Sequence, residues 1–250
     1  MELTGNTVLI TGGRSGIGAG LAKAFHELGN QVVVAGRRRD QLDAVAHAHP
    51  GMATLELDIT DPSSVTEASA ALLRDHPKLN VLINSSATML GDDPGHRMDE
   101  ADTTTQVAVN LLGPVRLTSA LMPHLRRQPR AHIVYTSSTL GFAPIALFAI
   151  YSATKAALHS YILSQRFLLK ESSVTVQEII PPWVGNGLAG SPDHPLAMPL
   201  DSFIAQTMQM LATDAAEVLV KEAAACRNNA GPDEHGFVDR LNTLFLAQSY

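Results

Sequence analysis

The stretch Thr11-Gly12-Gly13-Arg14-Ser15-Gly16-Ile17-Gly18 joins a short apolar run, residues 7–10, to a pattern with helical periodicity. Gly12 allows a tight turn, Gly16 lets the backbone approach a pyrophosphate, and Gly18 lets the helix pack closely on the strand. The free N–H groups of the helix N-terminus would then face the phosphates. Three glycines alone carry little weight, but their position between a first strand and a first helix predicts a dinucleotide-binding turn. The alternative is a turn with a purely structural role.

Short apolar and β-branched runs alternate with longer helical patterns along the chain. Two of the expected helices cover residues 102–126 and 151–171. Strands separated by helices imply right-handed crossovers and a parallel sheet that is covered on both sides. The sequence therefore predicts an α/β fold: a doubly wound, mostly parallel sheet of Rossmann type, with six or seven strands and helices on both faces. The predicted strands cover residues 7–10, 31–35, 54–57, 80–83, 131–136 and 173–180.

The length of the chain, 250 residues, is compatible with one α/β domain over residues 1–250. The sequence changes character after the sixth predicted strand, where Pro181-Pro182-Trp183 precedes a loop rich in Gly, Pro and Asp. Two helical segments follow and continue through Arg227. Because long irregular stretches in a domain are usually functional, we expect a substrate loop and helices at about 184–227.

Hydrophobic residues make up 45% of the chain, charged residues 17%, and the formal net charge is −6. An acidic balance without a basic face disfavours a nucleic-acid partner. The single cysteine, Cys226, excludes an intramolecular disulfide, and no apolar run reaches the roughly 18 residues of a membrane span. We therefore expect a cytoplasmic protein with no membrane association. The ten histidines show no metal-ligand spacing, so no metal is expected.

The end of the second predicted strand, Ala35-Gly36-Arg37-Arg38, indicates the type of coenzyme. An acidic residue about 20 positions after the glycine turn would bind the ribose 2′-hydroxyl of NAD, but no carboxylate precedes Asp40. Guanidinium groups can instead hold a 2′-phosphate through charge-assisted hydrogen bonds. Arg37 and Arg38, together with Arg14, therefore predict NADP(H) in preference to NAD(H).

Tyr151 and Lys155 are four residues apart in a helical pattern, so both side chains project from one face. Ser138 closes the preceding predicted strand, with Ser137 beside it. Ligands bind at the C-terminal ends of strands in open α/β sheets. These residues are therefore the candidates for catalysis.

The chain resembles short-chain dehydrogenases/reductases of the single-domain type. Two short runs, 153–157 and Pro181-Pro182, are similar to those of bacterial reductases associated with D-alanyl-lipoteichoate gene clusters. The resemblance covers most of the chain, and it is carried by the glycine turn, Asp58, Asn84, Asn110, Ser138, Tyr151, Lys155 and Pro181.

The resemblance implies a role for each catalytic candidate. Tyr151 would pass a proton to the substrate oxygen as a hydride arrives, or take a proton in the reverse direction. Lys155 would favour the phenolate and contact the nicotinamide ribose. Ser138 would polarise the carbonyl group, and Asn110 would bind a water that continues the proton path. The alternative for Asn110 is an amide satisfied within its helix.

The resemblance also implies contacts with the cofactor. Asp58 would contact the adenine, with Ile59 packed beside it, although Asp58 alone would be interpreted as a helix N-cap. The backbone of Val184 would face the carboxamide, and Asn186 would replace a hydroxyl that binds the same group. The predicted cofactor-binding residues are Gly12, Arg14, Ser15, Gly16, Ile17, Gly18, Arg37, Arg38, Asp58, Ile59, Asn84, Tyr151, Lys155, Pro181, Val184 and Asn186.

Two segments depart from the family pattern. Asn84-Ser85-Ser86-Ala87 replaces the usual Asn-Asn-Ala-Gly, which should alter the geometry without loss of binding if φ stays negative. A final strand is expected near the C-terminus, yet residues 233–245 have a helical pattern. The helical pattern therefore leaves two alternatives, a sheet of six strands and a sheet of seven.

We predict an NADP(H)-dependent oxidoreductase that transfers a hydride between the nicotinamide and a small-molecule carbonyl or alcohol substrate, which is expected to be apolar. The alternative is a nucleotide-binding regulatory protein of the same fold without efficient catalysis. The altered turn favours that alternative, and the intact catalytic residues oppose it. A homo-oligomer is expected, with a dimer formed through helices 102–126 and 151–171. The candidate substrate residues are Met89, Leu90, Thr139, Leu140, Phe142, Phe148 and Trp183.

Overall fold

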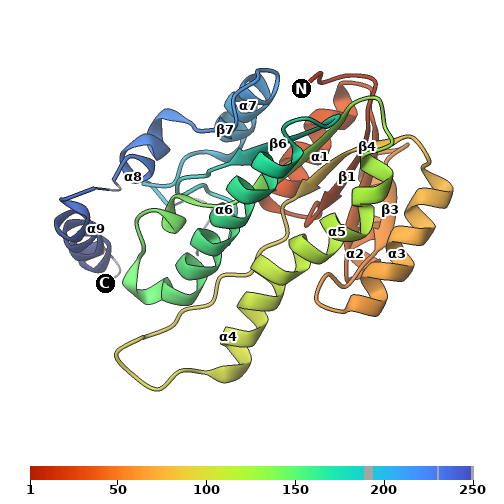
Figure 1. Ribbon diagram of the computed structural model, residues 1–250. Helices are drawn as coiled ribbons and strands as arrows, with labels where there is room; N and C mark the ends of the chain where they lie inside the picture. Colours follow the sequence, from red (N-terminus) through yellow and green to blue (C-terminus); the bar gives the residue numbers. More distant parts are fainter. Residues whose placement is uncertain (189–193, 230, 249–250) are drawn as a thin grey trace.

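One sheet of seven parallel strands runs through the computed structural model, in the spatial order β3-β2-β1-β4-β5-β6-β7 (Figure 1). The structure describes residues 1–188, 194–229 and 231–248. The strand order reverses between β1 and β4, the position at which open α/β sheets bind ligands. The predicted α/β fold, a doubly wound parallel sheet of Rossmann type, is confirmed. The strands are β1 (Thr7–Thr11), β2 (Gln31–Gly36), β3 (Ala53–Glu56), β4 (Leu79–Asn84), β5 (Ala131–Thr136), β6 (Val174–Ile179) and β7 (Glu217–Val218).

Helices cover both faces of this sheet. The helix predicted at 102–126 consists of α4, the π-helical turn η1 and α5, and the helix predicted at 151–171 is α6. The sequence patterns did not predict α2. Within the described residues, no helix is both long enough and apolar enough to cross a membrane. The helices and helical turns are α1 (Gly16–Glu27), α2 (Arg39–Ala48), α3 (Pro62–Asp75), α4 (Glu100–Val107), η1 (Ala108–Leu112), α5 (Gly113–Leu125), η2 (Thr139–Gly141), η3 (Ala146–Phe148), α6 (Ala149–Leu169), α7 (Leu200–Leu211), η4 (Lys221–Ala223), α8 (Ala224–Arg227) and α9 (Glu234–Gln248).

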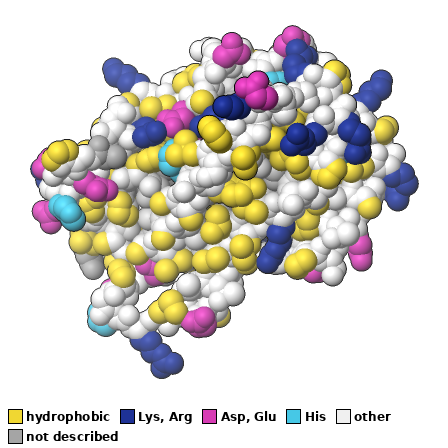
Figure 2. Space-filling view, in the orientation of Figure 1, with side chains coloured by type: hydrophobic (Ala, Val, Ile, Leu, Met, Phe, Trp, Pro, Cys, Tyr) yellow, Lys and Arg dark blue, Asp and Glu magenta, His cyan; other side chains and the backbone are white. Residues whose placement is uncertain are grey.

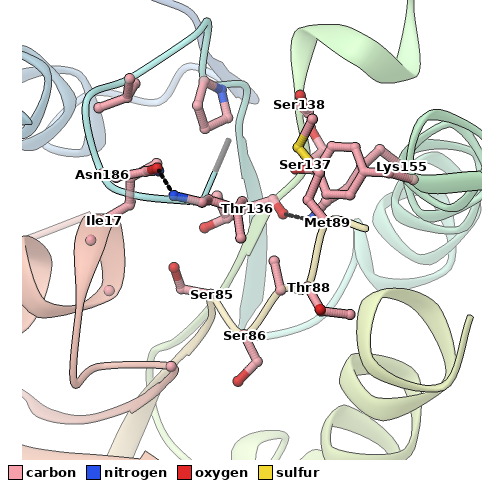
Figure 3. Close-up of a pocket in the computed structure, with 18 of the residues that line it drawn as sticks. Ile17, Ser85, Ser86, Thr88, Met89, Thr136, Ser137, Ser138, Lys155 and Asn186 are labelled. Carbon is pink, nitrogen blue, oxygen red and sulfur yellow. Dashed lines mark hydrogen bonds between the residues drawn. The ribbon is translucent and has the colours of Figure 1, made fainter. Parts of the chain in front are cut away.

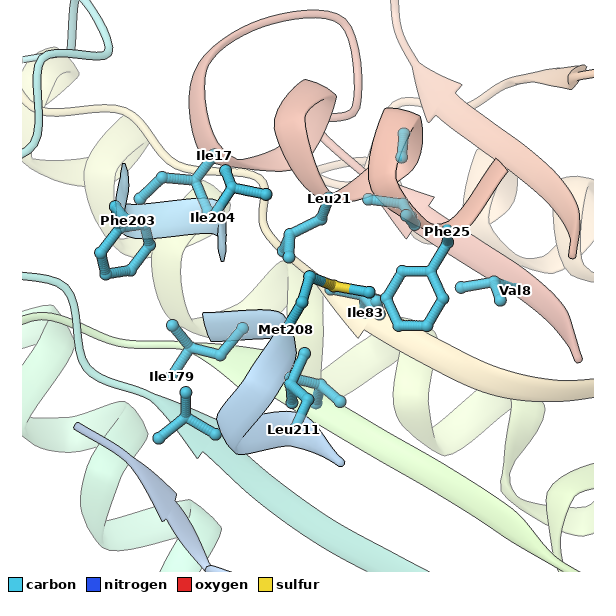
Figure 4. Close-up of a cluster of buried hydrophobic side chains, with 14 of the residues drawn as sticks. Val8, Ile17, Leu21, Phe25, Ile83, Ile179, Phe203, Ile204, Met208 and Leu211 are labelled. Atoms are coloured by element: carbon cyan, nitrogen blue, oxygen red, sulfur yellow. The ribbon is translucent and has the colours of Figure 1, made fainter. Parts of the chain in front are cut away.

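The burial of β1 explains its apolar sequence, because all five of its residues are buried. Successive side chains of a strand point to opposite faces. Val8 and Ile10 accordingly lie in one core cluster with Phe25 and Phe203, while Leu9 lies in the other. Figure 4 shows the first cluster, in which α1 and α7 meet over the sheet. Side chains from α3, α5 and α6 fill the second cluster.

Of the two alternatives, six strands or seven, the structure shows seven, and the seventh is β7. It has only two residues, Glu217 and Val218, which pair in parallel with Glu178 and Ile179 of β6. The Arg166 side chain secures this edge, because its guanidinium donates to the carbonyls of Val176 and Ala216. Within the predicted substrate region, residues 184–188 and 194–227 therefore contribute a strand as well as loop and helices, and residues 189–193 lie outside the described residues. Residues 233–245 are helical, as predicted, and belong to α9.

Candidate active site

A pocket of about 810 Å³ lies at the C-terminal ends of the central strands (Figure 3). A volume of this size suits a large cofactor or a cofactor with its substrate. The structure places Arg38, Asn84 and Asn110, all predicted site residues, outside the lining of the pocket. The predicted residues that do line it are Gly12, Arg14, Ser15, Gly16, Ile17, Gly18, Arg37, Asp58, Ile59, Ser138, Tyr151, Lys155, Pro181, Val184 and Asn186.

The glycine turn at one end of the pocket has no room for side chains. Gly12 and Gly16 have φ values of +67° and +56°, in the left-handed region that favours glycine. A Cβ atom on Gly18 would lie 2.5 Å from the carbonyl oxygen of Gly12. Because α1 begins at Gly16, its unpaired N–H groups and positive dipole end belong to this part of the pocket wall.

Three guanidinium groups gather beside the turn. Burial lowers the pKa of Arg14, and the nearby charges of Arg38 and Arg37 lower it further. Such mutual repulsion favours the binding of an anion between them. Burial raises the pKa of Asp58, but hydrogen bonds from Thr60 and the charge of Arg37 outweigh it, so the net shift is downward. The residues present thus fit a phosphorylated ribose at this end of the pocket.

The altered turn after β4 packs on the glycine turn through Thr11, whose hydroxyl oxygen accepts the N–H groups of Ser85 at 3.1 Å and Ser86 at 3.2 Å. Every described residue with positive φ is a glycine, so Ser85 and Ser86 retain negative φ as the expected tolerance requires. Asn84 donates to the Thr118 hydroxyl at 3.1 Å. Its amide therefore ties β4 to α5, away from the pocket.

Tyr151, Ser138 and Lys155 meet in the middle of the pocket. Tyr151 is only 5% exposed, and the Lys155 ammonium lies 5.5 Å from the centroid of its ring. Lys155 donates to the Thr136 carbonyl at 2.9 Å, a bond drawn in Figure 3. Ser138 accepts the Leu140 N–H at 3.1 Å. Ser137 also lines the pocket, and its hydroxyl donates to the Ile179 carbonyl.

Burial is the main cause of the pKa shifts of Tyr151 and Lys155. It raises the pKa of Tyr151 to about 12, although a hydrogen bond with Ser138 lowers that pKa. Burial lowers the pKa of Lys155 to about 8, against the opposing charge of Glu178. The phenol pKa thus shifts upward, opposite to the shift that the resemblance implies, because desolvation outweighs the hydrogen bond with Ser138. A neutral phenol is the form that donates a proton.

Asn110 lies in the π-helical turn η1 and has its amide groups paired. Its carbonyl oxygen accepts the Thr88 N–H at 2.9 Å, and its nitrogen donates to the Thr88 carbonyl at 2.8 Å and to the Thr154 hydroxyl at 3.3 Å. The amide is satisfied, as in the alternative interpretation, but its partners Thr88 and Thr154 lie outside its own helix. Asn110 holds the pocket-lining Thr88 against α6, and its contact with a water stays a prediction.

The apolar end of the pocket is built around aromatic side chains. The Phe245 ring lies 6.0 Å from the Phe148 ring and 6.2 Å from the Trp183 ring, centroid to centroid. Sequence reasoning missed Phe245 and Leu241 of α9 because a helical pattern does not reveal where the helix docks. Asn242 fixes α9 by donating to the Pro144 carbonyl at 2.9 Å. The predicted substrate residues that line the pocket are Met89, Thr139, Leu140, Phe148 and Trp183.

Two predicted substrate residues lie outside this lining. The Leu90 backbone N–H is bonded to Gln106. Phe142 faces away, with its ring against His159 at 4.6 Å and the Arg227 guanidinium at 4.6 Å. It packs in a separate cluster, in which His159, Glu178 and Glu217 place ligand-type atoms within 4.8 Å of one another.

The family of the protein is clear from comparison. The profile of the short chain dehydrogenase family matches residues 6–193. The chain belongs to this family, and it is an oxidoreductase. The resemblance predicted from the glycine turn and the Tyr151/Lys155 pair is confirmed.

Particular relatives refine this assignment. The chain is 40% identical over 189 residues to the oxidoreductase DltE of Bacillus subtilis, covering 75% of each chain, which supports the predicted closeness to D-alanyl-lipoteichoate-associated reductases. It is 30% identical to the NADP-dependent 3-hydroxy acid dehydrogenase YdfG of Escherichia coli K12, covering 71% of this chain and 72% of YdfG.

Solved structures share the fold. A short chain dehydrogenase from Burkholderia cenocepacia in complex with NADP superposes with a TM-score of 0.85 at 23% identity, covering 96% of this chain and 99% of that one. A Burkholderia phymatum protein in complex with NAD gives 0.83 at 20% identity, covering 96% of each chain. Proteins of this fold thus bind either coenzyme.

Proposed function

We propose that the protein is an NADP(H)-dependent oxidoreductase that interconverts apolar carbonyl compounds and alcohols, with Tyr151 as the acid and base. The observation that carries this proposal is the meeting of Tyr151, Ser138 and Lys155 in a pocket that also holds the glycine turn. A reduced nicotinamide would supply the hydride. The neutral phenol of Tyr151 is poised to donate its proton to the carbonyl oxygen, and Ser138 can polarise the same oxygen.

Lys155 contributes its charge to the reaction. Once Tyr151 has given up its proton, a phenolate remains in a site shielded from water. The ammonium 5.5 Å from the ring centroid stabilises that phenolate. Its bond to the Thr136 carbonyl fixes the ammonium between the tyrosine and the sheet, so the charge is already in position when the proton moves.

The coenzyme preference rests on the three arginines beside the turn. Arg14 and Arg37 line the pocket, and a ribose 2′-phosphate would satisfy their charges. Arg38 lies outside the lining but adds to the local positive potential. We therefore infer that NADP(H) binds more tightly than NAD(H).

The apolar end of the pocket indicates the substrate class. Leu140, Phe148, Trp183, Leu241 and Phe245 all belong to its wall. Among the described lining residues, the only Lys or Arg outside the glycine-turn end is the catalytic lysine, so no spare cation awaits a carboxylate. We propose uncharged apolar ketones or aldehydes as substrates, in contrast to the 3-hydroxy acids named for YdfG.

The reaction is tested by following NADPH oxidation with a panel of aliphatic and aromatic ketones, aldehydes and 3-keto acids. We expect turnover of the uncharged compounds, and a loss of about 10²–10⁴-fold in kcat for Tyr151→Phe with NADPH affinity retained. Absence of turnover with either coenzyme across the panel, together with intact NADPH binding, would support the regulatory alternative instead.

The coenzyme preference is tested by fluorescence titration of NADPH and NADH. Loss of a charge-assisted hydrogen bond costs about 1.5–3 kcal/mol, so we expect Arg37→Ala to weaken NADPH binding by roughly 10–150-fold and to leave NADH binding nearly unchanged. Equal affinity of the wild type for the two coenzymes would contradict the preference.

A further inference from the structure

A buried carboxylate lies behind the catalytic lysine. Glu178 of β6 is 0% exposed. One of its oxygens is 2.8 Å from Nδ1 of His159, and the other oxygen has no hydrogen-bond partner. Carboxylates are almost never fully buried unless a charge or a set of hydrogen bonds compensates them. The position of Glu178 therefore calls for a cation nearby.

The fold places Lys155 on the helix face that covers this carboxylate, close enough for their charges to interact but without a direct ion pair. Lys155 and His159 are one turn apart on α6, so their side chains share a face. The strand β5, whose Thr136 carbonyl accepts the Lys155 ammonium, pairs with β6 at Tyr135↔Glu178 and Thr136↔Ile179. Lys155 has three donors and one bond to the protein, while Glu178 has one free oxygen. The charge of Glu178 also acts on Lys155 electrostatically.

We propose that Glu178, held in place by His159, is a positioning residue that serves as the counter-ion of Lys155. Its charge keeps the lysine protonated in a fully buried site. This inference rests on the proposed catalytic use of Lys155, but the pairing itself concerns the protein without coenzyme.

A metal ion is a poorer occupant of this cluster. A divalent cation on His159, Glu178 and Glu217 would need oxygens from Glu217, and both of those oxygens accept bonds of 2.8 Å from Arg227. A guanidinium in that place repels a cation. Glu217 thus has a permanently charged counter-ion in direct contact, whereas Glu178 directly contacts only the titratable His159 and interacts with Arg227 through its charge.

Other titratable groups surround the pair and set the background charge. They are Tyr151, His159 and Arg166 on α6, Tyr135 on β5, Glu217 on β7, and Cys226 and Arg227 on α8. Arg227 and Arg166 both act on Glu217, so the experiment must separate the effect of Glu178 from that of this second carboxylate.

A double-mutant cycle in the coenzyme-free protein tests the pairing. Thermal unfolding at pH 7 is compared for wild type, Glu178→Gln, Lys155→Met and the double variant. We expect Glu178→Gln to lower Tm when Lys155 is present, because it leaves a buried ammonium uncompensated. In the Lys155→Met background the same change should be neutral or raise Tm. Equal shifts of Tm in both backgrounds would overturn the proposal.

Glu217→Gln is the matched control, because it removes a carboxylate of the same cluster. Its effect on Tm should be the same with and without Lys155→Met, and equal coupling of both carboxylates to Lys155 would also overturn the specific role of Glu178. In the active enzyme, Glu178→Gln should move the alkaline fall of kcat/KM down by about one pH unit, and Glu178→Asp should restore much of it. A wild type without reductase activity would refute the proposed function and leave the cycle interpretable.

Discussion

Two buried residues of the site, Tyr151 and Lys155, have pKa values shifted in opposite directions by the same physical cause. Burial disfavours the charged form of each, so it raises the pKa of the phenol and lowers that of the ammonium. In the coenzyme-free protein, the neutral phenol of Tyr151 thus lies next to the ammonium of Lys155, whose charge lowers the free energy of unfolding. This effect on stability can be measured.

The stability of the wild type should depend on pH through Lys155. Its pKa in the folded state is about 8, below the unfolded value of 10.5, so the unfolded chain binds more protons between these values. The free energy of unfolding therefore rises as pH increases from about 8 to 10.5, and this contribution is constant below that range.

Replacing Lys155 by Met should remove this pH dependence. The free energy of unfolding of the variant should then stay level between about pH 8 and 10.5, where that of the wild type rises by on the order of 3 kcal/mol. Urea denaturation at pH 7, 9 and 10.5 measures it. A wild type whose free energy of unfolding is flat across this range would contradict the burial of a charged lysine.

Residue identities predicted much of the site but not the direction of each side chain. The spacing of residues along the chain is enough to indicate the glycine turn, Tyr151 and Lys155 as parts of the site. Asn84 and Asn110 match the family pattern equally well, yet their amides are engaged by Thr118 and Thr88. Spacing along one chain does not show which partner a polar group finds across the fold.

At the scale of elements, the sharpest test concerns the contact between α1 and the glycine turn. A methyl group at position 18 would lie 2.5 Å from a backbone carbonyl that cannot move without breaking the turn. We expect Gly18→Ala to destabilise the protein by about 1–3 kcal/mol and to abolish NADPH binding at micromolar concentrations.

Gly231→Ala is the control for this substitution, because a Cβ atom at Gly231 would meet nothing within 4 Å. Its melting temperature and NADPH affinity should match those of the wild type. Unchanged coenzyme binding in Gly18→Ala would show that the close approach of helix and turn is not needed for the site.

Strands and helices could be predicted where the hydrophobic periodicity is strong. They were missed where contacts between distant parts of the chain determine the structure. Each of the six strands expected from the sequence differs from the observed strand by at most one residue at either end. The sequence patterns did not predict β7, because a strand of two residues is too short to show periodicity. It forms by pairing with the edge strand β6, and the hydrogen bonds of Arg166 hold it there. The docking of α9 likewise depends on contacts far away in the chain.

At the scale of the whole molecule, an exposed apolar surface lies on α6. Leu163, Phe167 and Leu168 are 47%, 67% and 77% exposed, and Figure 2 shows hydrophobic side chains gathered across the face that α5 and α6 present in Figure 1. Apolar surface of this extent favours association. The predicted dimer through these helices stays a prediction, as does the single domain of residues 1–250.

The dimer can be tested by placing a charge on this surface. We expect the wild type to elute as a dimer and Phe167→Asp as a monomer in size-exclusion chromatography with light scattering, because a buried unpaired carboxylate opposes association. Leu28→Asp alters a leucine that is 43% exposed at the end of α1 and should leave the dimer intact. A monomeric wild type would contradict the assembly.

The pocket is assembled from two stretches of the chain, one inside the segment that the family profile matches and one after it. Its turn, its arginines and its tyrosine all fall within the segment shared with the family, residues 6–193, whereas Leu196, Met198, Glu222, Leu241 and Phe245 come after it. Part of the apolar wall is thus built outside the segment that the family profile matches, while Phe148 and Trp183 of the same wall lie within it. Substitutions at Leu241 or Phe245 can therefore reshape the apolar end of the pocket without changing the glycine turn or the Tyr151/Lys155 pair, so this part of the wall can vary independently of them.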